Sequence, residues 1–253
     1  MKGTLRRSLT AYGVLTAREV EAYFLTPLAY IVLTMSLLIT GLTFYDVLQT
    51  AQGNVAEAVR VFFGFSVQFW LVILLVPPLI TMRLFAEEKR SGTFEMLLTA
   101  PVTDTAVVLA KFTGALIFFL TLWLPTLLYV AIVKSYGSIP DAGALLSTYI
   151  GIALVGALLL AIGCLCSSLS TNQIVAAITA LVLNLILFFV PFFSQVVVWP
   201  HLREFLEAVW PLKHFVDSFS KGVLDTGYLA YYVVLAALLL FLTVRVVEAR
   251  KWK

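Results

Sequence analysis

The sequence predicts an all-α membrane protein in which six apolar helices cross the bilayer. Hydrophobic residues make up 61% of the 253 residues and charged residues only 12%, whereas soluble domains are about half apolar and about a quarter charged. Six separate runs approach the roughly 20 apolar residues that a membrane-spanning helix requires. Basic residues gather at the ends of these runs. Together these features predict one transmembrane domain over residues 1–253 that faces lipid.

The apolar runs set the expected limits of the six spans. They cover residues 28–45, 61–82, 112–133, 144–166, 174–199 and 228–244. Prolines occur within three of them, at Pro77, Pro78, Pro125 and Pro191. Each proline removes a backbone donor and predicts a kink unless neighbouring groups compensate. In the fourth span, Gly156 and Gly163 lie among alanines at four-residue spacing, which predicts close packing between helices.

The distribution of basic residues predicts the orientation. If the N-terminus faces the cytoplasm, twelve of the 17 lysines and arginines fall in cytoplasmic segments and five in external ones. Cytoplasmic loops of membrane proteins carry such an excess. We therefore expect a multi-pass protein with both termini in the cytoplasm, which also requires an even number of spans.

Residues 1–26 precede the first span and predict an amphipathic helix on the membrane surface. Apolar side chains from Leu5 to Phe24 alternate with basic and acidic ones such as Arg6, Arg18 and Glu19. A helix with an apolar and a charged face lies along the headgroups. The alternative is a solvated run of charge. Pro27 would then begin the first span, where proline is tolerated.

Few polar residues offer chemistry inside the spans. Cys164 and Cys166 are two residues apart in an apolar run, so we expect them to pack rather than to form a disulfide. His201 and His214 lie in another segment, are expected at the surface or the membrane interface, and do not complete a metal site. Gln68 and Asn184 either bond across helices or face a pathway or dimer seam.

The loop between the second and third spans, Phe85–Pro101, carries the strongest functional signal. It predicts an extension of the second span, a break at Ser91–Gly92 and a short helix that Ser91 or Thr93 caps and that ends at Pro101. Glu95 suits the positive N-terminal end of that helix. Its apolar face would consist of Phe94, Leu97 and Leu98. Such a helix either docks into a groove of another protein or lies on the headgroups, and Thr103–Asp104 can cap the third span.

The stretch Glu87–Pro101 resembles the signature loop of type 2 ABC transporter permeases. Three further stretches are similar to the gliding-motility-associated branch of that family: Tyr23–Tyr30, Ser167–Ala177 and His214–Val223. They extend from the first span to the approach to the last. The resemblance therefore covers nearly the whole chain.

The resemblance implies a half-transporter of the bacterial inner membrane. Two six-span halves would pair, and cytoplasmic ATP-binding subunits beneath them would hold the ATP and Mg, with no cofactor in this chain. The loop would be the coupling helix that contacts the ATP-binding subunit. That contact would include Gly92, Thr93, Phe94, Glu95, Leu97 and Leu98, with Glu87 and Glu88 at the foot of the second span. The N-terminal helix would be the connecting helix, and short re-entrant helices would lie outside between spans five and six.

Motifs that the sequence lacks narrow the function further. It contains no G-x-x-x-x-G-K-[ST] phosphate loop and no G-x-S-x-G or H-E-x-x-H site, so we expect no catalytic residues. No span centre carries an ionisable residue, which argues against an ion-driven carrier. The net charge of +3 gives no support to nucleic-acid binding. Two functions remain: a permease that moves a substrate with ATP hydrolysed by a separate subunit, or a non-transporting anchor or assembly platform for a gliding or metalloenzyme-maturation complex.

Overall fold

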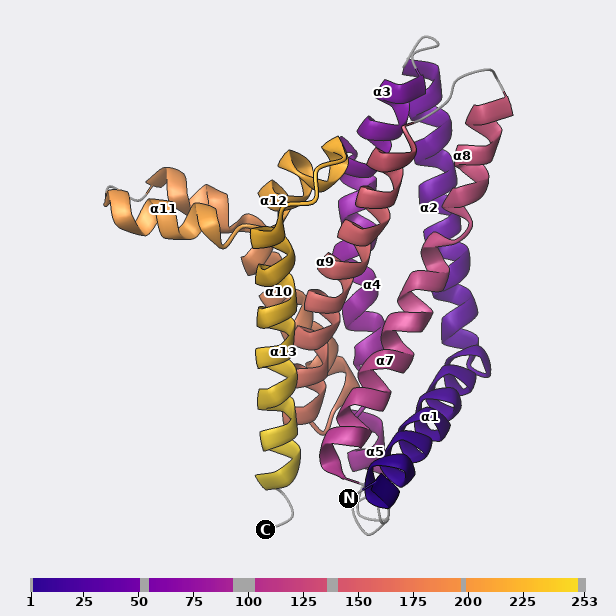
Figure 1. Cartoon of the computed structure of the whole chain (residues 1–253), viewed down its shortest axis with the longest axis vertical. Coiled ribbons are helices and arrows are strands. Elements are labelled where there is room, and N and C mark those ends of the chain that lie inside the picture. Colours follow the sequence, from indigo (N-terminus) through magenta and orange to yellow (C-terminus); the bar gives the residue numbers. More distant parts are fainter. Residues whose placement is uncertain (1, 51–54, 93–102, 136–140, 197–198, 250–253) are drawn as a thin grey trace.

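The computed structural model is an upright bundle of long helices (Figure 1). It describes residues 2–50, 55–92, 103–135, 141–196 and 199–249, with side chains from residue 12 onward except at 55–57 and 191–196. Within these residues there is no strand, and six helices are long and apolar enough to cross a membrane. The predicted all-α membrane fold with six spans is confirmed.

The helices follow the chain in the order that the apolar runs predict. Their bounds are α1 (Lys2–Phe24), α2 (Pro27–Thr50), α3 (Val55–Arg60), the π-helical turn η1 (Val61–Phe65), α4 (Val67–Thr81), α5 (Ala86–Ser91), α7 (Asp104–Trp123), α8 (Thr126–Ser135), α9 (Ala142–Leu169), α10 (Gln173–Val196), α11 (Pro200–Ala208), α12 (Pro211–Asp217), the 3₁₀ turn η2 (Phe219–Lys221) and α13 (Thr226–Ala249). The six candidate spans are 27–50, 67–91, 104–135, 142–169, 173–190 and 226–249.

Helices α4 and α9 form the buried centre of the bundle. Gly163 permits their close approach, because a Cβ at that position would lie 2.0 Å from the Thr81 hydroxyl. Gly156 does the same for α7, since its Cβ would lie 2.1 Å from the Phe119 ring. The predicted packing role of these small residues is confirmed. Cys164 and Cys166 are also buried, with free thiols.

The second span begins later than the apolar run indicates. Val61–Phe65 is a separate π-helical turn, and Ser66 is extended, with ψ at 131°. The Ser66 hydroxyl donates to the Phe62 carbonyl at 2.7 Å and accepts from the Phe69 amide at 3.3 Å. Because this one serine ends the turn and caps α4, the continuous helix starts at Val67.

Proline interrupts the third span as its position predicts. Helix α7 ends at Trp123 and α8 begins at Thr126, on either side of Pro125. The Thr126 hydroxyl lies 2.6 Å from the Trp123 carbonyl and 2.7 Å from the Tyr149 hydroxyl. The side chain of Thr126 therefore bonds across the break that the proline creates.

Between α10 and α13 the chain forms the short helices α11 and α12. Helix α11 projects sideways from the bundle (Figure 1), whereas α12 packs inward through the buried Phe215. The expectation that His214 lies at the surface is wrong: its side chain is buried and stacks on Tyr228 with ring centroids 4.2 Å apart. His201 on α11 is exposed, as expected.

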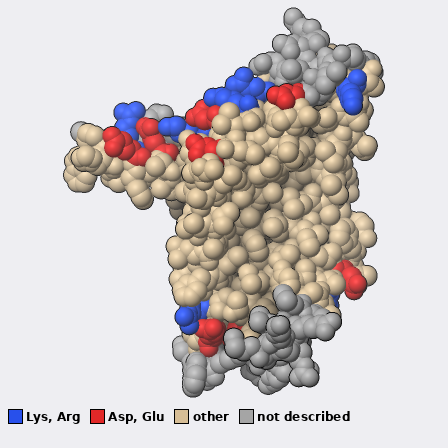
Figure 2. All heavy atoms as spheres, viewed as in Figure 1, with Lys and Arg blue, Asp and Glu red and all other residues tan. Residues whose placement is uncertain are grey.

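Charged side chains gather at the two ends of the molecule, separated by an uncharged belt (Figure 2). Helix α1 begins and α13 ends at the same end of the bundle as α5, while α3, α8 and α12 lie at the opposite end (Figure 1). This pattern is that of a protein whose belt contacts hydrocarbon and whose ends contact headgroups and water.

The buried His214 predicts a pH dependence of stability. Burial, together with the neighbouring Lys213, lowers the pKa of His214, although Asp217 and Asp225 oppose this. The folded state therefore binds the proton less tightly than the unfolded state, and stability is lost as the pH falls through about 6.5. We expect the Tm in detergent to fall between about pH 7 and 5 in the natural protein and less in His214→Gln. His201→Gln is the matched control and should keep the pH dependence of the natural protein. If His214→Gln also kept it, His214 would not be the group responsible.

Candidate functional site at the foot of the second span

The short helix α5 continues the second span beyond α4 and is capped by a side chain from another helix. The backbone amides of Phe85 and Ala86 donate to the Ser167 hydroxyl at 3.1 and 3.2 Å. The same hydroxyl donates to the Met82 carbonyl at 3.3 Å. The first amides of a helix have no partner within it, so Ser167 joins the start of α5 to the end of α9.

A buried lysine joins α5 to two further helices. The Lys111 ammonium on α7 lies 2.7 Å from a carboxylate oxygen of Glu88 on α5 and 3.1 Å from one of Glu19 on α1. Only 4% of the Lys111 side chain is exposed. The ammonium also lies 5.7 Å from the centre of the Phe85 ring. Charged hydrogen bonds in such a place are stronger than neutral ones and fix the relative positions of their helices.

Helix α1 packs along α7 beside this network. A Cβ at Gly114 would lie 2.9 Å from the Cβ of Glu19, so the glycine lets the two backbones approach. The Tyr23 ring stacks on Phe118 at 5.0 Å, and its hydroxyl donates to the Ile80 carbonyl at 3.1 Å. Burial raises the pKa of Tyr23, which keeps the phenol protonated as a donor. The predicted N-terminal helix is therefore present, with one side on α7; its place along the headgroups stays a prediction.

Two further polar contacts hold α5 in place. Lys89 donates to the carbonyl of Ser168 at the end of α9, and Arg83 pairs with Glu87 at 2.8 Å. Helix α5 then ends at Gly92, whose φ of 73° is left-handed. Glycine adopts this conformation without steric cost and is the usual residue at such a helix end. The break predicted at Ser91–Gly92 is confirmed.

The structure divides the predicted coupling residues into two groups. Glu87, Glu88 and Gly92 lie together at the foot of the second span. The other predicted contact residues lie outside the described part of the chain: Thr93, Phe94, Glu95, Leu97 and Leu98. Beyond that segment, Thr103 caps α7 by accepting from the Ala106 amide at 3.3 Å, as predicted.

Gln68 and Asn184 do not join this site or each other. Gln68 is exposed in the first turn of α4, near the opposite end of the bundle. Asn184 is fully buried on α10, beside Trp70 and a cavity of about 20 Å³. Within the described residues its side-chain amide has no protein partner. The expectation that it bonds across helices finds no support in these contacts.

Sequence reasoning missed the residues that hold α5 in place. In the distribution of basic residues, Lys111 is one of the twelve cytoplasmic cations, and no sequence motif assigns Lys111, Glu19 or Ser167 to a site. A usable signal existed, because Lys111 lies well inside α7, seven residues beyond Asp104 and surrounded by apolar residues. A charge within an apolar helix requires a partner from elsewhere. The identity of that partner depends on the tertiary packing.

A family model described as ABC-2 family transporter protein matches residues 42–247. The match begins within α2 and ends within α13, so it includes α5, Glu88 and Lys111 but not Glu19 on α1. A comparison with curated proteins found none that matches the chain.

The buried network predicts a large effect of removing its cation. Lys111→Met leaves Glu19 and Glu88 close together without their common partner, and breaking a buried ion pair costs about 3–5 kcal/mol. We expect the free energy of unfolding, measured by denaturant titration in mixed micelles, to fall by that amount. Lys111→Met combined with Glu19→Gln and Glu88→Gln should recover most of the loss.

Arg203→Gln is the matched control. It breaks the exposed pair with Glu207, in which the Arg203 side chain is 60% exposed, and such pairs contribute at most about 1 kcal/mol. If Lys111→Met were as mild as this control, the network would not hold the three helices together.

Proposed function

The chain belongs to the ABC-2 transporter family, and from this premise we propose that it is a permease subunit driven by ATP that a separate cytoplasmic subunit hydrolyses. The single observation that supports the proposal most is the anchoring of α5. This helix is bonded directly to α7 and α9 and, through Lys111, indirectly to α1. It ends directly before the segment expected to contact the partner. ATP and Mg would be held by that partner, and this chain would contribute no catalytic residue.

The anchoring of α5 suggests how force would enter the membrane. A displacement of residues 93–98 would act on α5 through Gly92. Glu88 and Lys111 would pass the movement to α7 and α1, and Ser167 would pass it to α9, one of the two helices at the buried centre of the bundle. Helices packed in this way move as discrete bodies rather than by gradual deformation.

The same proposal covers orientation and assembly. We infer that the end carrying α5 faces the cytoplasm of a bacterial cell, with both termini on that side, because most basic residues lie there. We also infer pairing with a second permease half, for which the exposed apolar residues of α10, such as Ile178 and Ile186, are available. We further propose that the chain falls in the gliding-motility-associated branch, and the three similar stretches Tyr23–Tyr30, Ser167–Ala177 and His214–Val223 support this.

The proposal is tested at the expected contact. Glu95→Arg with Leu98→Asp reverses a charge and removes an apolar residue from the face that the sequence predicts for the loop helix. We expect at least about tenfold less of a candidate ATP-binding subunit to co-purify when the two are expressed together, because a disrupted contact of about 1.4 kcal/mol already changes affinity tenfold. Membrane insertion should be unchanged.

A matched control makes the same changes at the opposite end. Glu204→Arg with Leu202→Asp alters exposed residues of α11 and should leave co-purification intact. Equal recovery of the ATP-binding subunit with the loop variant and the natural chain would refute the coupling role. Transport by the reconstituted pair, measured with labelled candidate substrates, separates a transporter from the alternative of a non-transporting assembly platform.

A further inference from the structure

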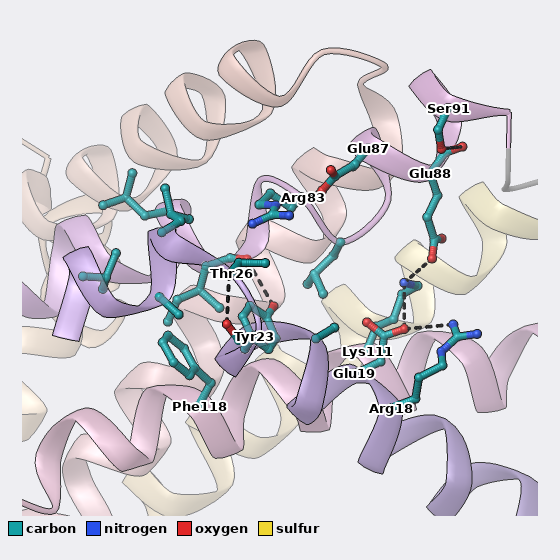
Figure 3. Close-up of a pocket in the computed structure, with 17 residues that line it drawn as sticks. Arg18, Glu19, Tyr23, Thr26, Arg83, Glu87, Glu88, Ser91, Lys111 and Phe118 are labelled. Carbon is teal, nitrogen blue, oxygen red and sulfur yellow. Dashed lines mark hydrogen bonds and ion pairs between the residues drawn. The ribbon is translucent and has the colours of Figure 1, made fainter.

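A pocket of about 340 Å³ lies where α1, α2 and α4–α5 meet over α7 (Figure 3). Its volume falls within the range of ligand pockets, about 300–1,000 Å³. One end of the pocket is formed by the charged side chains around Lys111, and the other contains Phe118 (Figure 3). The two ends therefore favour a ligand with a charged part and an apolar part.

The charged end has equal numbers of cations and anions. The lining side chains of this end are Arg18, Arg83, Lys111, Glu19, Glu87 and Glu88. A site for an anionic lipid is instead recognised by an excess of basic residues. Balanced charges favour a zwitterion, whose phosphate and ammonium can each find an opposite partner.

The two arginines have hydrogen-bonding capacity for a phosphate. Lys111 is already bound between Glu19 and Glu88. Arg83 pairs with Glu87 through Nε, so its terminal amino groups can donate to a phosphate. Arg18 has a single ion pair, with Glu19 at 3.3 Å. A guanidinium presents its N–H groups in a planar fork that matches phosphate oxygens.

The apolar end lies against residues that reach the lipid-facing surface. Val32 and Leu79 line it from α2 and α4, and 37% of Leu79 is exposed on the outside of the bundle. The pocket also lies beside Thr26 and Leu28, where the first span begins. A spanning helix begins at the boundary between headgroups and hydrocarbon, so the pocket lies at headgroup depth.

We propose that this pocket binds a zwitterionic phospholipid from the leaflet on the α5 side, with its phosphate on Arg18 and Arg83 and its ammonium beside Glu87. The glycerol and the first part of the acyl chains lie along Val32 and Leu79. Because the lipid contacts α1, α4 and α5 together, it joins the helix before the first span to the helix that ends at Gly92. The inference does not require the ATP-binding partner.

The test uses the full chain purified in detergent and follows the Tm during lipid titration. Phosphatidylethanolamine should raise the Tm at a concentration at least about tenfold lower than phosphatidylglycerol does, and free phosphoethanolamine should not raise it. Arg18→Gln and Arg83→Gln should each weaken the phosphatidylethanolamine effect about tenfold, since a hydrogen bond to a charged group contributes about that much.

Arg245→Gln is the matched control, because Arg245 is an exposed cation on α13 that pairs with Glu248 at 3.0 Å. It should leave the titration unchanged. Any of three results would overturn the proposal: the two lipids raise the Tm equally, free phosphoethanolamine alone raises the Tm, or Arg18→Gln leaves the titration unaltered. If Arg83→Gln does not fold because it loses its ion pair, the result with Arg18→Gln decides the test. Arg18 is largely exposed, so its substitution should leave the fold intact.

Discussion

The position of Lys111 constrains the whole end of the bundle on which α5 lies. An ammonium group that is almost completely removed from water must have anionic partners, because desolvating it alone costs several kcal/mol. Those partners come from α1 and α5 rather than from the helix that carries the lysine. The three helices can therefore separate only by exposing or abandoning charge, and this limits them to moving together.

Around Lys111, neutral contacts fix the positions of these helices relative to their other neighbours. Ser167 holds the start of α5 against α9, and Gly114 sets how closely α1 approaches α7. The opposite half of the molecule is organised differently, through aromatic packing of Phe69, Trp70 and Phe215. Buried charge thus joins the helices where force would be received, and aromatic packing joins them toward the far end.

The fold could be predicted from sequence because hydropathy and helix length act locally. Six spans, the break at Pro125 and the end of α5 at Gly92 follow from residue types in their own segments. The start of α4 could not be predicted from hydropathy, since Val61–Phe65 is as apolar as the helix and only the two bonds of Ser66 separate them. The burial of His214 and Lys111 could not be predicted either, because other segments of the chain supply their surroundings: Tyr228 stacks on His214, and Glu19 pairs with Lys111.

The sideways course of α11 makes the two halves of the molecule unequal in width. Its nine residues extend about 13 Å at the helical rise of 1.5 Å per residue, and Trp199 and Phe205 present exposed rings suited to the membrane interface. Helix α11 therefore occupies membrane area at the end of the molecule remote from α5. Among the described residues, the end that carries α5 has no equivalent projection (Figure 1). A body that is broader in one leaflet experiences the lateral pressure of the two leaflets differently. The free energy of this protein in the membrane therefore depends on the curvature stress of the surrounding bilayer.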